Sequence, residues 1–131
     1  MEHCFPINNQ NDPNIRGSIK EVIDTYKRSV EEVNFAGPTK FAPILKKFQE
    51  QINQYAKQKV KKYGVLLLLT DGAINDMEET KELIVQLSKQ ACSIIIIGVG
   101  TADFTDMIDE LDSPDGLLQD ENENQCVRDM V

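Results

Sequence analysis

The sequence predicts an α/β fold in which helices cover a parallel sheet. Two runs, 65–69 and 94–97, are apolar at every position and do not alternate with polar residues. Such runs are typical of strands that are covered on both faces, as in parallel sheets. The stretch between them has apolar residues at helical spacing. Together the three segments predict a strand–helix–strand unit with a right-handed connection.

The N-terminal part predicts one strand followed by one helix. Residues 3–8, "HCFPIN", are expected to form a short strand, which Pro6 restricts to a sheet edge or a strand end. Ser18 and Glu21 have the spacing of a capping box. A helix should follow them, because apolar residues recur at helical spacing from Ile19 onward. "FAGPTK" then ends that helix.

A second amphipathic helix should follow, with its apolar stripe running from Phe41 to Tyr55. It ends in the basic stretch "KQKVKK", residues 57–62, which we interpret as a solvated helix end rather than a binding patch. Asp76 and Glu79 are expected to cap the helix between the two strands. "DFTDMIDEL" predicts one further short helix. The acidic segment from Asp109 to Glu123 lacks the spacing of an EF-hand calcium loop and is interpreted as a solvated loop.

Composition excludes several classes of function. The chain has 131 residues, enough for one domain, which we expect to span 1–131. With 14 basic and 22 acidic side chains, its net charge of −8 argues against binding to nucleic acid or to anionic lipid. No apolar run is long enough to span a bilayer, and no secretory signal is visible. The 3 cysteines form no CxxC pair, so we expect a cytoplasmic location.

Catalytic sites are not indicated either. No P-loop motif accompanies the apolar strands, and "GVGTAD" has two of the three glycines of a dinucleotide fingerprint, with Asp103 in place of the third. His3 is the one histidine, in an edge segment, so a Ser–His or Cys–His pair is not expected. We therefore expect a protein that is not an enzyme.

A site for a hard cation is the remaining functional interpretation. Ligands bind open parallel sheets at the carboxyl ends of the strands, where Asp71 follows the first apolar run. Thr39, at the start of the second long helix, offers a hydroxyl, and oxygen ligands suit Mg²⁺, Ca²⁺ or Mn²⁺. The alternative is that Asp71 binds the N–H groups of its own turn and Thr39 caps its helix. Residue types alone favour this alternative.

The sequence resembles a known family over essentially its whole length. "GPTKFAPIL", "YGVLLLLTDGAINDMEETKELI", "SIIIIGVGTADFTDMIDELD" and "CVRDMV" resemble, in this order, the A domain of copines. Related plant RING ubiquitin ligases carry the same domain. "EHCFPIN" and "SIKEVIDTYKRSV" fall where that family has a strand and its following helix.

Copine A domains are similar to von Willebrand factor A domains, which implies a three-layer, doubly wound, Rossmann-like sheet with a metal-ion-dependent adhesion site. In that site a D-x-[ST]-x-S loop, a threonine and a further aspartate hold the ion. Thr39 of "GPT" matches the threonine, and Asp71 of "TDG" matches the aspartate. The D-x-[ST]-x-S motif does not occur here. The resemblance thus implies an incomplete sheet that lacks the family's first, second and last strands.

These matches imply a non-enzymatic protein-interaction module, related to calcium-dependent phospholipid-binding proteins. We expect Thr39 and Asp71 to bind Mg²⁺ or Mn²⁺, or else Ca²⁺, weakly or not at all without the missing loop. A protein partner with an acidic residue would complete the site, and only full-length relatives would associate peripherally with the plasma membrane. Two alternatives are a fragment of a copine-domain RING ubiquitin ligase and a structural remnant without ligand. An uncovered sheet edge also leads us to expect marginal stability.

Overall fold

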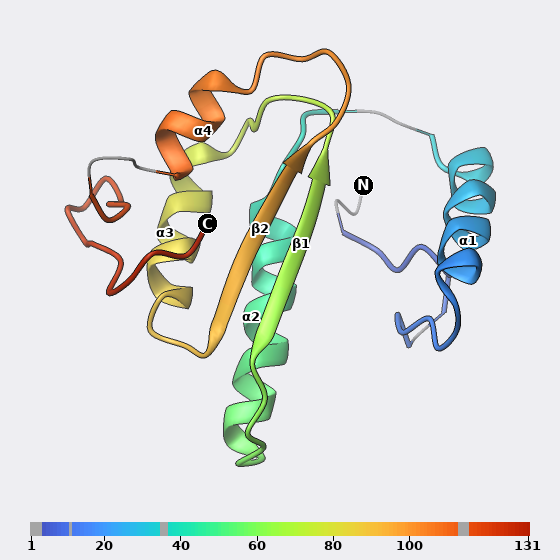
Figure 1. Cartoon of the computed structure of the whole chain (residues 1–131), viewed down its shortest axis with the longest axis horizontal. Coiled ribbons are helices and arrows are strands. Elements are labelled where there is room, and N and C mark those ends of the chain that lie inside the picture. Colours follow the sequence, from blue (N-terminus) through green and yellow to red (C-terminus); the bar gives the residue numbers. More distant parts are fainter. Residues whose placement is uncertain (1–3, 11, 35–36, 113–115) are drawn as a thin grey trace. The chain divides into compact units, whose positions relative to one another are not determined.

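The computed structural model describes residues 4–10, 12–34, 37–112 and 116–131. The fold is mixed α/β and divides into two compact units, Met1–Gly37 and Pro38–Val131. In chain order the described elements are α1 (Ile19–Glu32), α2 (Ala42–Lys57), β1 (Gly64–Thr70), α3 (Met77–Leu87), β2 (Cys92–Gly98) and α4 (Thr105–Leu111), as Figure 1 shows. None of the helices that the structure describes is both long and apolar enough to cross a membrane.

The C-terminal unit is built on two parallel strands. β1 and β2 pair in register from Gly64 opposite Cys92 to Thr70 opposite Gly98, and α3 connects them, as the apolar runs predict. The helix α2 runs along one face of this sheet (Figure 1). The side chains between sheet and helices form the core, where Leu45, Ile84 and Leu87 are almost completely buried.

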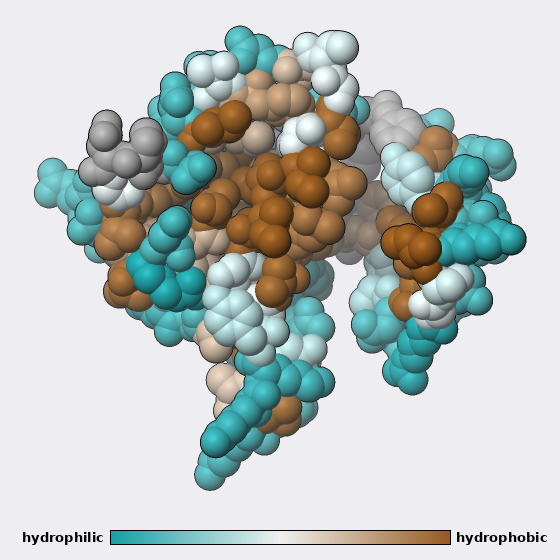
Figure 2. Space-filling model, viewed as in Figure 1, coloured by the Kyte–Doolittle hydropathy of each residue, from teal (hydrophilic) through white to brown (hydrophobic). Residues whose placement is uncertain are grey.

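The other face of the same sheet is exposed. Side chains alternate along β1, so that Leu66 and Leu68 face the core while their neighbours Val65, Leu67 and Leu69 do not. Together with Ile95 and Ile97 of β2, these neighbours are between 43% and 65% exposed. Figure 2 shows the resulting brown, hydrophobic patch over the strands. Within the C-terminal unit the helices lie on one side of the sheet only, so this unit by itself does not supply the predicted cover on the second face.

The N-terminal unit contains α1 and the loop before it. Ser18 occupies the position before the helix, but its side chain makes no capping hydrogen bond, so the predicted capping box does not form. The predicted strand "HCFPIN" is also wrong for residues 4–8, which form no strand; His3 lies outside the described residues. A strand needs a neighbour for its backbone groups, and the carbonyl of Pro6 instead accepts a turn hydrogen bond from Asn9 N–H at 3.1 Å.

The acidic C-terminal stretch is more ordered than a solvated loop. Leu118 and Cys126 are buried and join the core, and the backbone N–H of Cys126 binds the carbonyl of Leu118 at 2.8 Å. The nearly buried Asp120 carboxylate accepts hydrogen bonds from the backbone N–H groups of Asn122 and Asn124, each at 2.9 Å. Hydrogen bonds from Asn124 lower the pKa of Asp120. The interpretation as a solvated loop is therefore wrong for this part. The backbone turns around the Asp120 carboxylate and donates hydrogen bonds to it, and the flanking residues Leu118 and Cys126 are buried.

The last residues of the chain lie along the outer edge of β2. The backbone N–H of Ile94 donates to the carbonyl of Met130 at 2.9 Å. The Arg128 guanidinium donates to the carbonyl of Gln90 at 2.8 Å and also to that of Cys92. The start of the outer edge of β2 is thus bound, whereas the described residues supply no partner to the outer edge of β1.

Two adjacent residues of β2 test which face of the sheet is packed. Ile94 is 3% exposed and Ile95 is 48% exposed, so the same substitution should have opposite consequences. We expect Ile94→Thr to lower the free energy of unfolding by at least about 2 kcal/mol, through lost apolar contacts and a buried hydroxyl. Ile95→Thr should change it by less than about 0.5 kcal/mol. Urea unfolding of both variants measures this, and an equal loss would mean that the second face is also covered.

Candidate functional site

Thr39 and the loop after β1 are held together at the carboxyl edge of the sheet. The backbone N–H of Thr39 donates to Asn75 Oδ1 at 2.9 Å, and the backbone N–H of Asn75 donates to the carbonyl of Thr39, also at 2.9 Å. This reciprocal pair joins two segments that are 36 positions apart in the sequence. As a result, the Thr39 hydroxyl oxygen lies 3.9 Å from where a Cβ on Gly72 would stand.

Asp76 adds a second connection between the same two segments. It stands at the N-cap position of α3 but makes no side-chain hydrogen bond to the N–H groups of that helix. Instead its two carboxylate oxygens accept hydrogen bonds from the backbone N–H groups of Phe41 and Ala42, each at 2.9 Å. These groups belong to the start of α2, where free N–H groups and the helix dipole favour a negative charge. The prediction that Asp76 caps its own helix is wrong, since its carboxylate caps the neighbouring helix.

The same contacts decide the role of Thr39 at its helix. The N-cap position of α2 is Phe41, and Asp76 supplies the carboxylate there. The alternative in which Thr39 acts as the N-cap is therefore wrong. Its hydroxyl is left beside Gly72, on the loop that carries Asp71.

The turn after β1 does not use the Asp71 side chain. Thr70 Oγ1 donates to the carbonyl of Gly72 at 3.0 Å and lies 3.5 Å from its backbone nitrogen. Asp71 is exposed, and its carboxylate has no hydrogen-bond partner among the described residues. The alternative in which Asp71 closes its own turn is therefore wrong. A carboxylate and a hydroxyl on neighbouring loops are oxygen donors of the kind that hard cations prefer.

The donor set is small. Within the described ranges, no three His, Cys, Asp or Glu side chains come close enough to hold a metal ion. Thr39 and Asp71 are thus at most part of a site. Sequence reasoning missed the contacts of Asn75 with Thr39 and of Asp76 with the start of α2. These partners lie across the fold, and a single sequence gives no signal for such contacts.

The end of β2 does not form a phosphate-binding loop. The Asp103 carboxylate accepts hydrogen bonds from the backbone N–H and the hydroxyl of Thr105 at 3.0 and 2.7 Å, and these bonds lower its pKa. A Cβ on Gly98 would come within 2.8 Å of the Phe104 ring, so this glycine makes room for packing rather than for a ligand. Charge and packing both disfavour an anion here, in agreement with the exclusion of a dinucleotide fingerprint.

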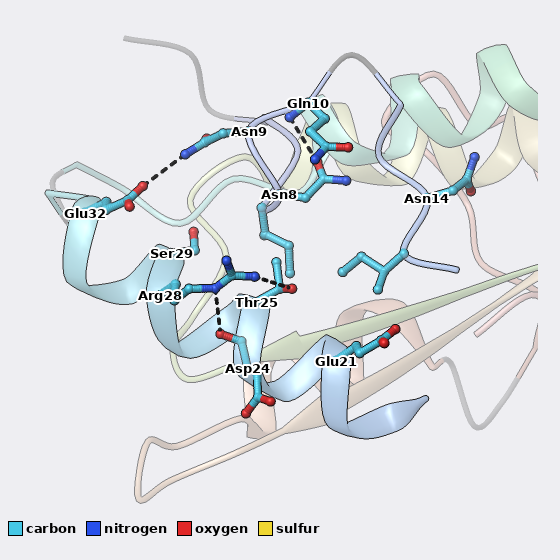
Figure 3. A pocket seen from close by; sticks show the side chains of 12 residues that line it. Asn8, Asn9, Gln10, Asn14, Glu21, Asp24, Thr25, Arg28, Ser29 and Glu32 are labelled. Atoms are coloured by element: carbon cyan, nitrogen blue, oxygen red, sulfur yellow. Dashed lines mark hydrogen bonds between the residues drawn. The ribbon is translucent and has the colours of Figure 1, made fainter. Parts of the chain in front are cut away.

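The N-terminal unit has a polar pocket of about 570 Å³ between α1 and the preceding loop (Figure 3). Its charged and amide side chains bind one another. Asn9 Nδ2 donates to Glu32 at 3.1 Å, and the Arg28 guanidinium donates to Thr25 Oγ1 at 3.3 Å and to the carbonyl of Asp24 at 3.4 Å. These contacts explain how a loop rich in amides is held on the helix. They do not bring together a catalytic or metal-binding set.

The fold and this edge define a mixed α/β domain with a parallel sheet, in which the segment of Thr39 lies beside the loop that follows β1. The chain matches the copine family over residues 1–131. It is also 38% identical to Copine-C of Dictyostelium discoideum over 134 aligned positions. That alignment covers 98% of this chain and 24% of the relative, so the chain spans about a quarter of the curated relative's length. The chain belongs to the copine family, as the resemblance predicted.

Removing the Asp76 carboxylate tests whether it organises this edge. Asp76→Ala leaves two N–H groups of α2 without an acceptor, and we expect it to lower the free energy of unfolding by about 1–2 kcal/mol. Asp71→Ala is the matched control. It removes a carboxylate without protein partners and should change stability by less than about 0.5 kcal/mol. Urea denaturation measures both, and equal destabilisation would show that Asp71 has a structural role.

Proposed function

We propose that this chain is a non-catalytic, copine-type protein-binding module whose ligand edge contains Thr39 and Asp71. One observation carries the proposal: the Asp71 carboxylate is not used by its own turn, while Asn75 and Asp76 hold Thr39 beside the same loop. A structural role for Asp71 would require contacts that the described residues do not make. Family membership supports the assignment, because the resemblance puts both residues at positions of a metal-ion-dependent adhesion site.

The ion that fits these donors is Mg²⁺, Mn²⁺ or Ca²⁺, since a carboxylate and a hydroxyl are hard oxygen ligands. The Asp71 side chain would bind the ion directly or through a water molecule, and the Thr39 hydroxyl would bind it directly. Two protein ligands leave most of the coordination shell to water. Affinity for the ion alone is therefore weak, and an acidic side chain of a protein partner adds the missing negative charge.

Other copine properties are proposed at the level of the whole protein. The relative is about four times as long as the part it shares with this chain, so calcium-dependent phospholipid binding and peripheral membrane association are assigned to parts beyond this alignment. We propose a cytoplasmic location and a von Willebrand factor A-type arrangement for the complete domain. The match to Copine-C gives no support to the alternative of a RING ubiquitin ligase.

Titration with Mn²⁺ tests the ligand edge. Mn²⁺ is paramagnetic and broadens the NMR signals of nearby amides, so it reports binding that is too weak for calorimetry. We expect selective broadening of the amides of Thr39, Asp71 and Gly72, with a dissociation constant no tighter than about 1 mM. Asp71→Asn should abolish it, because the amide lacks the charge that attracts the ion.

Asp103→Asn is the matched control for this titration. Asp103 is also exposed and also follows a strand of the sheet, but its carboxylate is occupied by Thr105. The selective broadening should persist in this variant. Uniform broadening, or broadening that survives Asp71→Asn, would contradict the proposed site.

A further inference from the structure

A basic cleft lies at the opposite end of the strands from Thr39 and Asp71. It is bounded by the last turns of α2, by the residues that lead into β1 and by those that lead into β2. Its volume is about 680 Å³. Three lysines line it, Lys61, Lys62 and Lys89, and no acidic side chain does. This is unusual for a chain whose net charge is −8.

The three lysines are available for a ligand. The ion pairs in the described part of the chain join other residues, and none involves a lysine of the cleft. Lys62 Nζ lies 4.8 Å from the centre of the Tyr55 ring, which holds this ammonium over the apolar wall of the cleft. Lys89 also contributes to the lowered pKa of Asp120, after the hydrogen bonds from Asn124 and Asn122. That carboxylate is already bound by its own loop.

The walls of the cleft also offer apolar surface. Val60 is 39% exposed and Tyr63 is 58% exposed. The Tyr63 hydroxyl is fixed by contacts to Ser93 Oγ at 2.6 Å and to the carbonyl of Cys92 at 3.1 Å, so its ring is held in place at the rim. A ligand that fits this surface carries at least one apolar group together with its negative charge.

The cleft contains one unsatisfied acceptor. Gln90 lines it, and Gln90 Oε1 is buried without a hydrogen-bond partner among the described residues. A buried acceptor without a donor is destabilising, so a ligand that supplies an N–H gains from this group once the amide turns toward it. A peptide backbone has such N–H groups. An ionised phosphate or a lipid carboxylate does not.

We propose that this cleft binds an acidic peptide segment of a protein partner. Carboxylates of the peptide pair with Lys61, Lys62 and Lys89, an apolar side chain contacts Val60 and Tyr63, and a backbone N–H donates to Gln90. An anionic membrane is the weaker fit, because the net charge of the chain repels it and its phosphates supply no N–H for Gln90. The stretch 57–62, interpreted from the sequence as a solvated helix end, thereby contributes to a binding surface.

Fluorescence anisotropy of the full chain tests this proposal. The probe is a fluorescein-labelled peptide with a central leucine flanked on both sides by glutamates, and its control has glutamines in their place. We expect the glutamate peptide to bind at least about tenfold more tightly, since the charges supply most of the difference. Raising the salt concentration should weaken it. Equal binding of the two peptides, or no binding of either, would overturn the proposal.

Matched variants show whether the cleft itself is responsible. The double variant Lys61→Glu/Lys62→Glu should weaken binding by at least about tenfold. Lys20→Glu/Lys27→Glu, on α1, changes the net charge equally and should have no comparable effect. Gln90→Met keeps the charge and removes the acceptor, and it should weaken binding several-fold. Circular dichroism checks that each variant is folded. An equal loss of peptide affinity in both double variants would mean that binding depends on net charge and not on the cleft.

Two further measurements distinguish peptide binding in the cleft from binding to a membrane and from metal binding at the ligand edge. Vesicles containing phosphatidylserine should not compete with the glutamate peptide, and competition at low lipid concentration would favour a membrane surface instead. Asp71→Ala should bind the peptide as the unsubstituted chain does, so a failure at the metal-binding edge does not affect this result. Loss of peptide binding in Asp71→Ala would contradict a separate site.

Discussion

The contacts of Asp76 hold the C-terminal unit together at the proposed ligand edge, which contains Thr39 and Asp71. One carboxylate begins α3 in the sequence and caps α2 in space, so the position of one helix determines that of the other. Asn75 also joins these two segments, through its reciprocal pair of hydrogen bonds with Thr39. Helix starts carry partial positive charge, so the Asp76 carboxylate stabilises the start of α2 and ties it to the residue that precedes α3. The geometry of Thr39 and Asp71 depends on this arrangement.

This arrangement also leaves the side chains of Thr39 and Asp71, the candidate metal ligands, without hydrogen bonds to other described residues. Because Thr70 closes the turn after β1 and Asp76 supplies the cap, the side chains of Thr39 and Asp71 have no structural task among the contacts that are described. Exposed carboxylates commonly bind the N–H groups of their own turn. Here neighbouring residues make those bonds, and the two side chains that the family resemblance marks are the ones left available.

The sequence predicted the elements well and the contacts between them poorly. Continuous apolar runs identified β1 and β2, and apolar spacing identified the helices, because both signals are local. The exposure of Leu67 could not be predicted, since burial depends on what packs on the second face. Likewise, the role of Asp76 depends on a helix 34 positions away. Of the candidate site, Thr39 and Asp71 were predicted as ligands through the family resemblance, whereas the contacts of Asn75 and Asp76 became visible only in the fold.

The two edges of the sheet differ in how many of their backbone groups are bound, and this difference has a consequence for strand addition. Sheets extend from molecule to molecule when both outer strands present unpaired backbone groups. In the part of this chain that is described, Met130 and Arg128 bind two such groups of β2, the N–H of Ile94 and the carbonyl of Cys92, while the outer edge of β1 has no described partner. An added strand, from another segment of the same protein or from a second molecule, would therefore find more unpaired backbone groups beside β1 than beside β2.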